Sequence, residues 1–162
     1  MQYGKTKMKK VYLETSFFSF YYDERPESSY RSQVTRDWWE HERHRYDLVT
    51  SYVSIEEAGL PVYPNWEKVK ALAEQVPVLA EAPDIGGIVK VYLEHQLMPQ
   101  DDVADALHLA IASYHEVDYL LTWNCRHIAN VNKYEHIRAI NLRLGLLTPF
   151  LITPELLFAE DE

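Results

Sequence analysis

Cysteine is almost absent from this chain, since Cys125 is the only one among 162 residues. A single cysteine cannot form an internal disulfide, which is typical of proteins that work in the reducing cytoplasm. Long apolar runs are missing as well, because no stretch approaches the roughly 20 apolar residues that a membrane-spanning helix needs. We therefore expect a soluble cytoplasmic protein without a membrane partner.

Several motif classes are also absent, and each absence argues against one kind of site. The histidines and Cys125 form no CxxC, HExxH or paired His/Cys spacing, which argues against zinc. No GxGxxG or GxxxxGKS/T loop follows an apolar run, so a Rossmann-like enzyme of small molecules would lack an evident phosphate-binding loop.

Positive charge is in the minority, because Lys and Arg total 16 against 25 Asp and Glu, and the net charge is −9. An acidic protein that binds nucleic acid must concentrate its cations locally or rely on a metal ion. The best local candidate is the predicted helix from about Ser28 to Arg45, which carries Arg31, Arg36, Arg43, Arg45, His41, His44, Trp38 and Trp39. We favour a simpler interpretation, in which the tryptophans belong to the core or to a dimer contact and the arginines pair with Asp37, Glu40 and Glu42.

Three short apolar runs have the length and continuity of strands that are covered on both faces, as in a parallel sheet: KVYLETS at 10–16, YDLVTSYVS at 46–54 and DYLLTWN at 118–124. Short strands at 78–79 and 148–152 would complete the sheet. Helices are predicted at about 28–45, around Glu56 and Glu57, and at 65–75, 84–97, 103–114 and 133–144. We therefore predict an α/β fold with a mostly parallel sheet of four to five strands, flanked by helices on both faces. It would form a single domain at 11–162, after a basic, flexible leader at 1–10.

The predicted helix at 103–114 is apolar on nearly all sides and carries one carboxylate, Asp105. Such a helix packs on both sides, so an ionised carboxylate there needs a cation, a hydrogen-bond donor or a metal nearby. A helix cap begun by Asp101 or Asp102 is the alternative interpretation.

Polar residues follow each of the three apolar runs: Glu14, the pair Glu56 and Glu57, and Asn124. In open parallel sheets, ligands bind beyond the carboxyl ends of the strands. We therefore expect three carboxylates from distant parts of the chain to converge there with Asp105. Clustered carboxylates need a counter-charge, and oxygen ligands favour Mg²⁺ or Mn²⁺.

Together these segments resemble the PIN-domain ribonucleases, and among them the VapC-like toxins of bacterial and archaeal toxin–antitoxin pairs. The resemblance covers about Val11 to Leu157 and rests on VYLETS, VSIEEAGLP, DALHLAIA, DYLLTWNCRHIAN and ITPELL, with QVTRDWWEHER like the first helix of one PIN subgroup. It implies a single PIN-like domain and metal-dependent cleavage of RNA. The implied partners are an RNA substrate, a small basic antitoxin and a second copy of the chain in a homodimer.

Carried over by position, the acids of the family fall on Glu14, where Asp is usual, on Glu57, with Glu56 as the adjacent alternative, and on Asp105. These three would hold Mg²⁺ or Mn²⁺. The fourth position is Asn124 rather than an acid, and the further position that some relatives use is His127. Thr15, Ser16 and Thr122 would orient the carboxylates, or would simply be turn residues at strand ends. Asp102 is a less certain member of the site.

The missing fourth acid leaves a second function open. An Asn oxygen can ligate Mg²⁺, but one carboxylate fewer weakens metal binding. The alternative to an endoribonuclease is therefore a PIN-fold module that binds RNA or protein without cutting.

Overall fold

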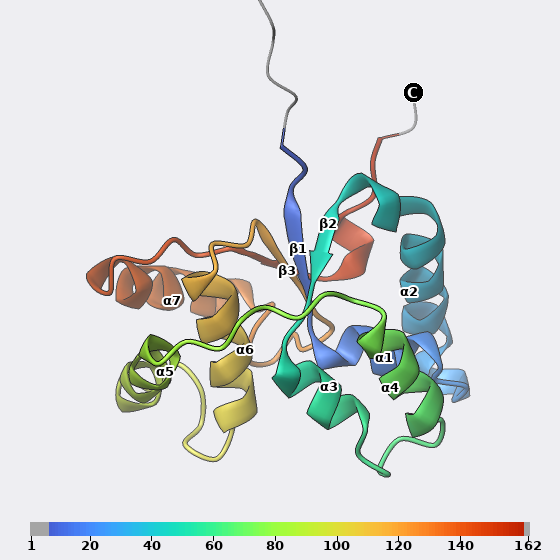
Figure 1. The fold of residues 1–162 in the computed structure, drawn as a ribbon, viewed down its shortest axis with the longest axis horizontal. Helices are drawn as coiled ribbons and strands as arrows, with labels where there is room; N and C mark the ends of the chain where they lie inside the picture. Colours follow the sequence, from blue (N-terminus) through green and yellow to red (C-terminus); the bar gives the residue numbers. More distant parts are fainter. Residues whose placement is uncertain (1–6, 161–162) are drawn as a thin grey trace, which may run out of the picture.

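A four-stranded sheet forms the centre of the molecule, in a computed structural model that describes residues 7–160 (Figure 1). The strands are β1 (Lys10–Leu13), β2 (Asp47–Val49), β3 (Tyr119–Leu121) and β4 (Phe150–Ile152), in the order β2-β1-β3-β4. Every pairing is parallel, with Tyr12 opposite both Val49 and Leu120. The predicted α/β fold is confirmed, with four strands rather than five, because Val78 forms only an isolated bridge to Thr50.

Helices cover both faces of the sheet, as the continuous apolar runs predict. On one face lie α5 (Asp84–Glu94), α6 (Val103–Tyr114) and α7 (Val131–Arg143), which share a core with Tyr12 and Leu120. On the other lie α1 (Thr15–Tyr21), α2 (Ser29–Glu42) and α4 (Trp66–Glu74), around Val11, Leu13 and Leu121. The alternation of side chains along β1 and β3 thus supplies two separate cores.

Helix α3 (Tyr52–Ala58) lies beyond the end of β2 and packs against α1, α4 and α6. Ser51 begins it by accepting a hydrogen bond from the Ser54 amide. Short 3₁₀ turns complete the chain at η1 (Pro26–Ser28), η2 (Arg43–Arg45) and η3 (Pro154–Leu156). None of the described helices is long and apolar enough to cross a membrane.

Helix α1 is the main element that the sequence pattern did not indicate. It starts directly after β1, with Glu14 as its N-cap, and it buries Phe17 and Phe18 in the core. The proposed leader at 1–10 falls mostly outside the described residues, and Lys10 already belongs to β1.

Candidate functional site

The carboxyl ends of β1, β2 and β3 lie along one edge of the sheet, because all their pairings are parallel. Glu14 follows β1 directly, Thr122 follows β3, and α3 follows β2 after a two-residue connection. Helix α6 packs against α3. Side chains from four distant parts of the sequence therefore meet at this edge.

Glu14 is only 6% exposed and is fixed through one of its two carboxylate oxygens. Its Oε2 accepts hydrogen bonds from the Ser16 amide at 2.8 Å, the Ser16 hydroxyl at 2.5 Å and the Thr122 hydroxyl at 2.9 Å. Its Oε1 lies 3.9 Å from Nε2 of His108 and accepts no hydrogen bond from residues 7–160. Among the described residues, Oε1 of Glu14 therefore faces the His108 imidazole without a hydrogen bond.

Glu57 is fixed in the same way. Its Oε1 accepts from the Thr15 hydroxyl at 2.7 Å and pairs with Nε2 of His108 at 2.6 Å. Its Oε2 has no hydrogen-bond partner within the described part of the chain. Glu56, one residue earlier on α3, is exposed and lies outside this group.

A buried histidine connects the two glutamates. His108 on α6 is fully buried and lies 2.7 Å from the Tyr12 hydroxyl through Nδ1, while that hydroxyl lies 2.6 Å from Oγ of Ser51. Both ring nitrogens therefore have partners, which a buried imidazole requires. Neither Tyr12 nor His108 is among the residues that the sequence assigned to the site.

Charge explains why His108 tolerates this buried position. Burial disfavours a charged imidazole there. The Tyr12 hydroxyl and the carboxylates of Glu57 and Glu14 outweigh that effect, so the pKa of His108 is raised well above its usual value. Burial would also raise the pKa of Glu57, but the hydrogen bonds and charge of His108, with the Thr15 hydroxyl, lower it. The raised pKa of His108 thus favours a charged imidazole between the carboxylates of Glu57 and Glu14, which lie 2.6 Å and 3.9 Å from its Nε2.

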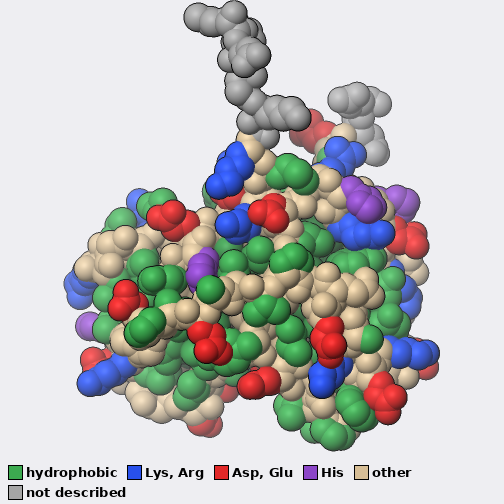
Figure 2. All heavy atoms as spheres, in the orientation of Figure 1, with side chains coloured by type: hydrophobic (Ala, Val, Ile, Leu, Met, Phe, Trp, Pro, Cys, Tyr) green, Lys and Arg blue, Asp and Glu red, His purple; other side chains and the backbone are tan. Residues whose placement is uncertain are grey.

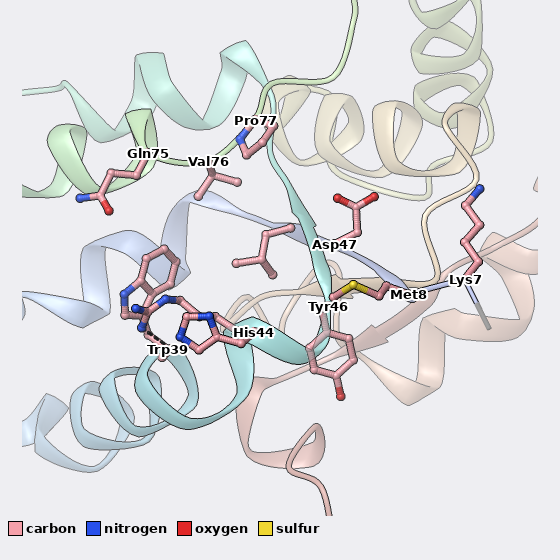
Figure 3. A pocket seen from close by; sticks show the side chains of 11 residues that line it. Lys7, Met8, Trp39, His44, Tyr46, Asp47, Gln75, Val76 and Pro77 are labelled. Atoms are coloured by element: carbon pink, nitrogen blue, oxygen red, sulfur yellow. Dashed lines mark hydrogen bonds between the residues drawn. The ribbon is translucent and has the colours of Figure 1, made fainter. Parts of the chain in front are cut away.

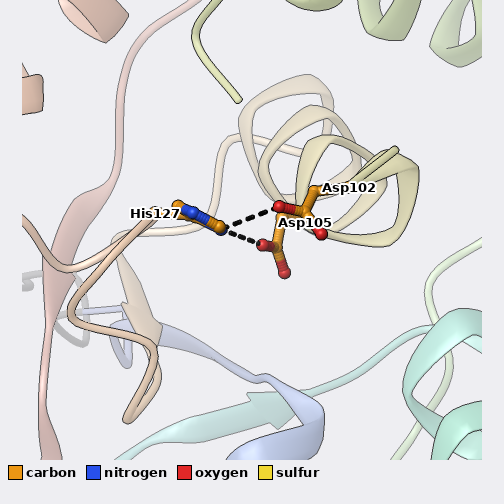
Figure 4. A group of neighbouring side chains, drawn as sticks. All are labelled: Asp102, Asp105 and His127. Atoms are coloured by element: carbon orange, nitrogen blue, oxygen red, sulfur yellow. Dashed lines mark hydrogen bonds and ion pairs between the residues drawn. The ribbon is translucent and has the colours of Figure 1, made fainter. Parts of the chain in front are cut away.

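A second polar group lies at the start of α6 (Figure 4). Nδ1 of His127, from the loop after β3, points at both α6 aspartates, at 2.9 Å from Oδ2 of Asp105 and 3.2 Å from Oδ2 of Asp102. Asp102 is the N-cap of α6 but makes no side-chain cap hydrogen bond. The carboxylate of Asp105 therefore meets an imidazole rather than the free amides that a capping role requires.

Asp102, Asp105 and His127 could hold a metal ion. One ligand atom from each lies within 4.8 Å of the other two, and all three residues are partly exposed. Glu14 and Glu57 do not belong to this close group, although they were predicted to share a metal with Asp105. The structure thus places the predicted acids in two adjoining groups.

Two connections join these groups. Asp105 and His108 are three residues apart on α6, so their side chains lie on neighbouring positions of one helix face, with about 5–6 Å between Cβ atoms. The loop after β3 makes the second connection, because the Thr122 hydroxyl binds Glu14 and also accepts from the Asn124 amide at 2.9 Å. Oδ1 of Asn124 in turn accepts from the His127 amide at 2.9 Å.

Three hydroxyl residues that were predicted to orient the carboxylates do lie next to them. The Thr15 hydroxyl donates to Glu57, and the Ser16 and Thr122 hydroxyls donate to Glu14. Asn124 is also in the network, but its side-chain oxygen is directed at a backbone amide. The sequence does point to His108, which lies one turn from Asp105 on an otherwise apolar helix, but a histidine with a structural role in the helix is the interpretation that it favours. Tyr12 had no such signal, because an aromatic residue inside a strand usually belongs to the core.

The arginines of α2 and η2 make few ion pairs. Trp38 is buried, as predicted, and its Nε1 donates to the carbonyl oxygen of Leu157 at 2.8 Å. Arg45 pairs with Glu42 at 3.1 Å. Within residues 7–160, the expected carboxylate partner is missing for the other three: Arg31, Arg36 and Arg43 contact aromatic rings or backbone carbonyls instead.

Positive charge is visible at the other end of the sheet. Figure 2 shows Lys, Arg and His side chains gathered over the end of α2 and the start of β2, and several acidic side chains along the opposite border. A hollow of about 660 Å³ lies at this basic end, with Trp39, Tyr46 and Val76 among its lining residues (Figure 3). Its lining includes Asp47 but none of the residues of the two groups at the carboxyl ends of the strands.

No known family model matches the chain, and no curated protein matches it either.

Proposed function

We propose that this protein is a metal-dependent endoribonuclease of the PIN type that hydrolyses phosphodiester bonds in RNA. The observation that carries the proposal is a pair of glutamates, each fixed through one oxygen, that adjoin His108 on the same helix as Asp105. Among residues 7–160, Glu14 and Glu57 each accept hydrogen bonds through one oxygen and accept none through the other, and His108 lies one helical turn from Asp105 on α6.

The donor atoms fit a hard divalent cation. Carboxylate oxygens predominate at this edge, and they favour Mg²⁺ or Mn²⁺. In the proposal, a bound ion draws the two adjoining groups together, so that Glu14, Glu57 and Asp105 hold it and Asp102 is an additional oxygen ligand. A bound ion of this kind supplies an activated water and neutralises charge on the phosphate.

The remaining side chains act on the acids rather than on the substrate. Thr122 and Ser16 hold Oε2 of Glu14, while Thr15 and His108 hold Oε1 of Glu57. His127 directs the carboxylate of Asp105 through Nδ1. Such orienting partners typically change metal affinity 10–100-fold when they are removed.

The resemblance also supplies the biological setting of the proposal. A VapC-like toxin would be held inactive by a small basic antitoxin, and the net charge of −9 is suited to a basic partner. A homodimer is part of the same proposal. If the neighbouring reading frame encodes a short basic protein, that finding would support the toxin assignment.

The test is cleavage of a panel of fluorescent structured and single-stranded RNAs with Mn²⁺, Mg²⁺ or EDTA. Asp105→Asn is compared with Asp101→Asn, which removes the same charge from an exposed residue just before α6. We expect metal-dependent cutting by the wild type and by Asp101→Asn, and loss of cutting in Asp105→Asn. Equal cutting by all three proteins, or cutting in EDTA, would contradict the proposal.

A second candidate function is a PIN-fold module that binds RNA or protein without cutting. It is favoured by Asn124, which adds no negative charge and whose oxygen already accepts from the His127 amide. Mn²⁺ titration separates the two functions. An enzyme should bind Mn²⁺ measurably and lose that binding in Asp105→Asn, whereas the non-cutting module should bind RNA with no dependence on Mn²⁺.

A further inference from the structure

We infer that Arg31 is a phosphate contact for RNA beside the acidic site, positioned on an aromatic platform made by Phe20 and Trp123. The inference rests on the proposed function, because it names the group that receives the RNA backbone. The inference assigns phosphate binding to one arginine of α2, and not to the basic surface over the end of α2 and the start of β2.

The platform fixes the guanidinium without neutralising it. The guanidinium carbon of Arg31 lies 5.4 Å from the ring centroid of Phe20 and 5.4 Å from that of Trp123. The two rings are themselves 6.1 Å apart in an edge-on arrangement. Cation–π contacts of this kind orient a guanidinium but leave its N–H groups available to an anion.

The backbone of Arg31 is held as well. The Thr35 hydroxyl donates to the Arg31 carbonyl at 2.6 Å and accepts from Nε1 of Trp123 at 2.8 Å. A single buried hydroxyl therefore joins the first turns of α2 to the platform. Arg31 itself is exposed and has no carboxylate partner among residues 7–160.

The platform is attached directly to the acidic site. The Trp123 amide donates to the Ser16 hydroxyl at 2.8 Å, and that hydroxyl donates to Oε2 of Glu14 at 2.5 Å. Trp123 also lies between Thr122 and Asn124, which belong to the same network. A strand of RNA whose scissile phosphate lies at the acids and which runs past Trp123 would therefore pass Arg31.

Electrostatics explains why such a cation is needed. The protein carries a net charge of −9, and the acids at this edge repel a polyanion. A guanidinium that is already oriented loses little freedom when it binds a phosphate, and it can bind two oxygens at once. Arg31 has no carboxylate partner among residues 7–160 and is joined to the acidic site through Trp123 and Ser16, so it is suited to bind an RNA phosphate there.

The experiment measures binding of a fluorescent single-stranded RNA in EDTA, so that cleavage does not contribute. Arg31→Gln is compared with Arg31→Lys and with Arg45→Gln, which removes the same charge just beyond the other end of α2. We expect about ten-fold weaker binding by Arg31→Gln, as for the loss of a charged hydrogen bond. Its slope of log K against log salt should be less steep by about 0.7, the value for one phosphate of a single strand.

Arg31→Lys should keep most of the salt dependence, and Arg45→Gln should bind like the wild type. Equal losses in Arg31→Gln and Arg45→Gln, an unchanged salt slope in Arg31→Gln, or no RNA binding by the wild type would overturn the inference. If Arg31→Gln does not fold, loss of the salt slope in folded Arg31→Lys would overturn it as well. RNA binding that depends on Arg31 without any cleavage would uphold the inference while the nuclease proposal fails, so the two failures are distinguishable.

Discussion

Thr122→Val tests whether the hydroxyl groups at the end of the strands orient the carboxylates. Thr122 is fully buried, its Oγ1 donates to Oε2 of Glu14 at 2.9 Å, and the same oxygen accepts from the Asn124 amide. Valine has nearly the same shape, so the substitution removes the hydroxyl and little else. Glu14 loses one of three donors, and the Asn124 amide loses its acceptor.

Two magnitudes follow. A hydrogen bond to a charged group contributes about 1.5–3 kcal/mol, so we expect the free energy of unfolding to fall by about 2–3 kcal/mol. Loss of a partner that orients a metal ligand typically weakens metal binding 10–100-fold, so Mn²⁺ affinity should fall at least about ten-fold. Urea denaturation in EDTA measures the first quantity, and calorimetric titration with Mn²⁺ measures the second.

The matched control is Thr50→Val. Thr50 is also fully buried at the same edge of the sheet, but its hydroxyl donates to the carbonyl oxygen of Leu13 at 2.7 Å and touches no carboxylate. Thr50→Val should lose about 1–2 kcal/mol of stability and keep wild-type Mn²⁺ affinity. Equal Mn²⁺ affinity in the two variants would refute the orienting role of Thr122, whatever their stabilities.

Three further predictions concern buried polar side chains and their hydrogen-bond partners. Replacing His108 by Leu should cost about 3 kcal/mol or more of unfolding free energy in EDTA, because Glu57 then loses its buried cationic partner; a loss below about 1 kcal/mol would contradict the ion pair. In the metal-free wild type, stability should be greatest between about pH 4.5 and 6.5, the ordinary values of Glu57 and His108. The raised pKa of His108 contributes stability that is present below pH 6.5 and is lost as the pH rises, while the lowered pKa of Glu57 contributes stability that is lost as the pH falls below 4.5. Denaturation from pH 4 to 9 should therefore show a decline above 6.5 that is smaller in His108→Leu, and a decline of equal size in both proteins would argue against it. Tyr92→Phe should lose about 1–3 kcal/mol, since the Tyr92 hydroxyl donates to Oδ1 of Asn141 at 2.5 Å and burial raises the pKa of Tyr92 to about 12. Tyr30→Phe, which breaks an exposed hydrogen bond to Glu155, is its control and should be nearly neutral.

The sequence by itself determined the class of fold and the edge of the sheet at which the acids gather. Continuous apolar runs such as KVYL and YLL form strands that are buried on both faces, and such strands pair in parallel beneath helices. Parallel pairing then brings Glu14 and the start of α3 to one edge, whatever the details of packing. These conclusions depend on local hydrophobicity and chain direction, which are written in the order of the residues.

Only the tertiary structure decided which of these side chains meet. Neighbouring residues on a helix point about 100° apart, so the rotation of α3 in its packed position exposes Glu56 and directs Glu57 to His108. The partner of Asp105 is His127, from the loop after β3, and the oxygen of Asn124 is occupied by a backbone amide. Which oxygen of a carboxylate accepts hydrogen bonds, and which does not, depends on donors from residues that are distant in sequence, such as Thr122 for Glu14. Those contacts result from three-dimensional packing, and no local pattern of residues specifies them.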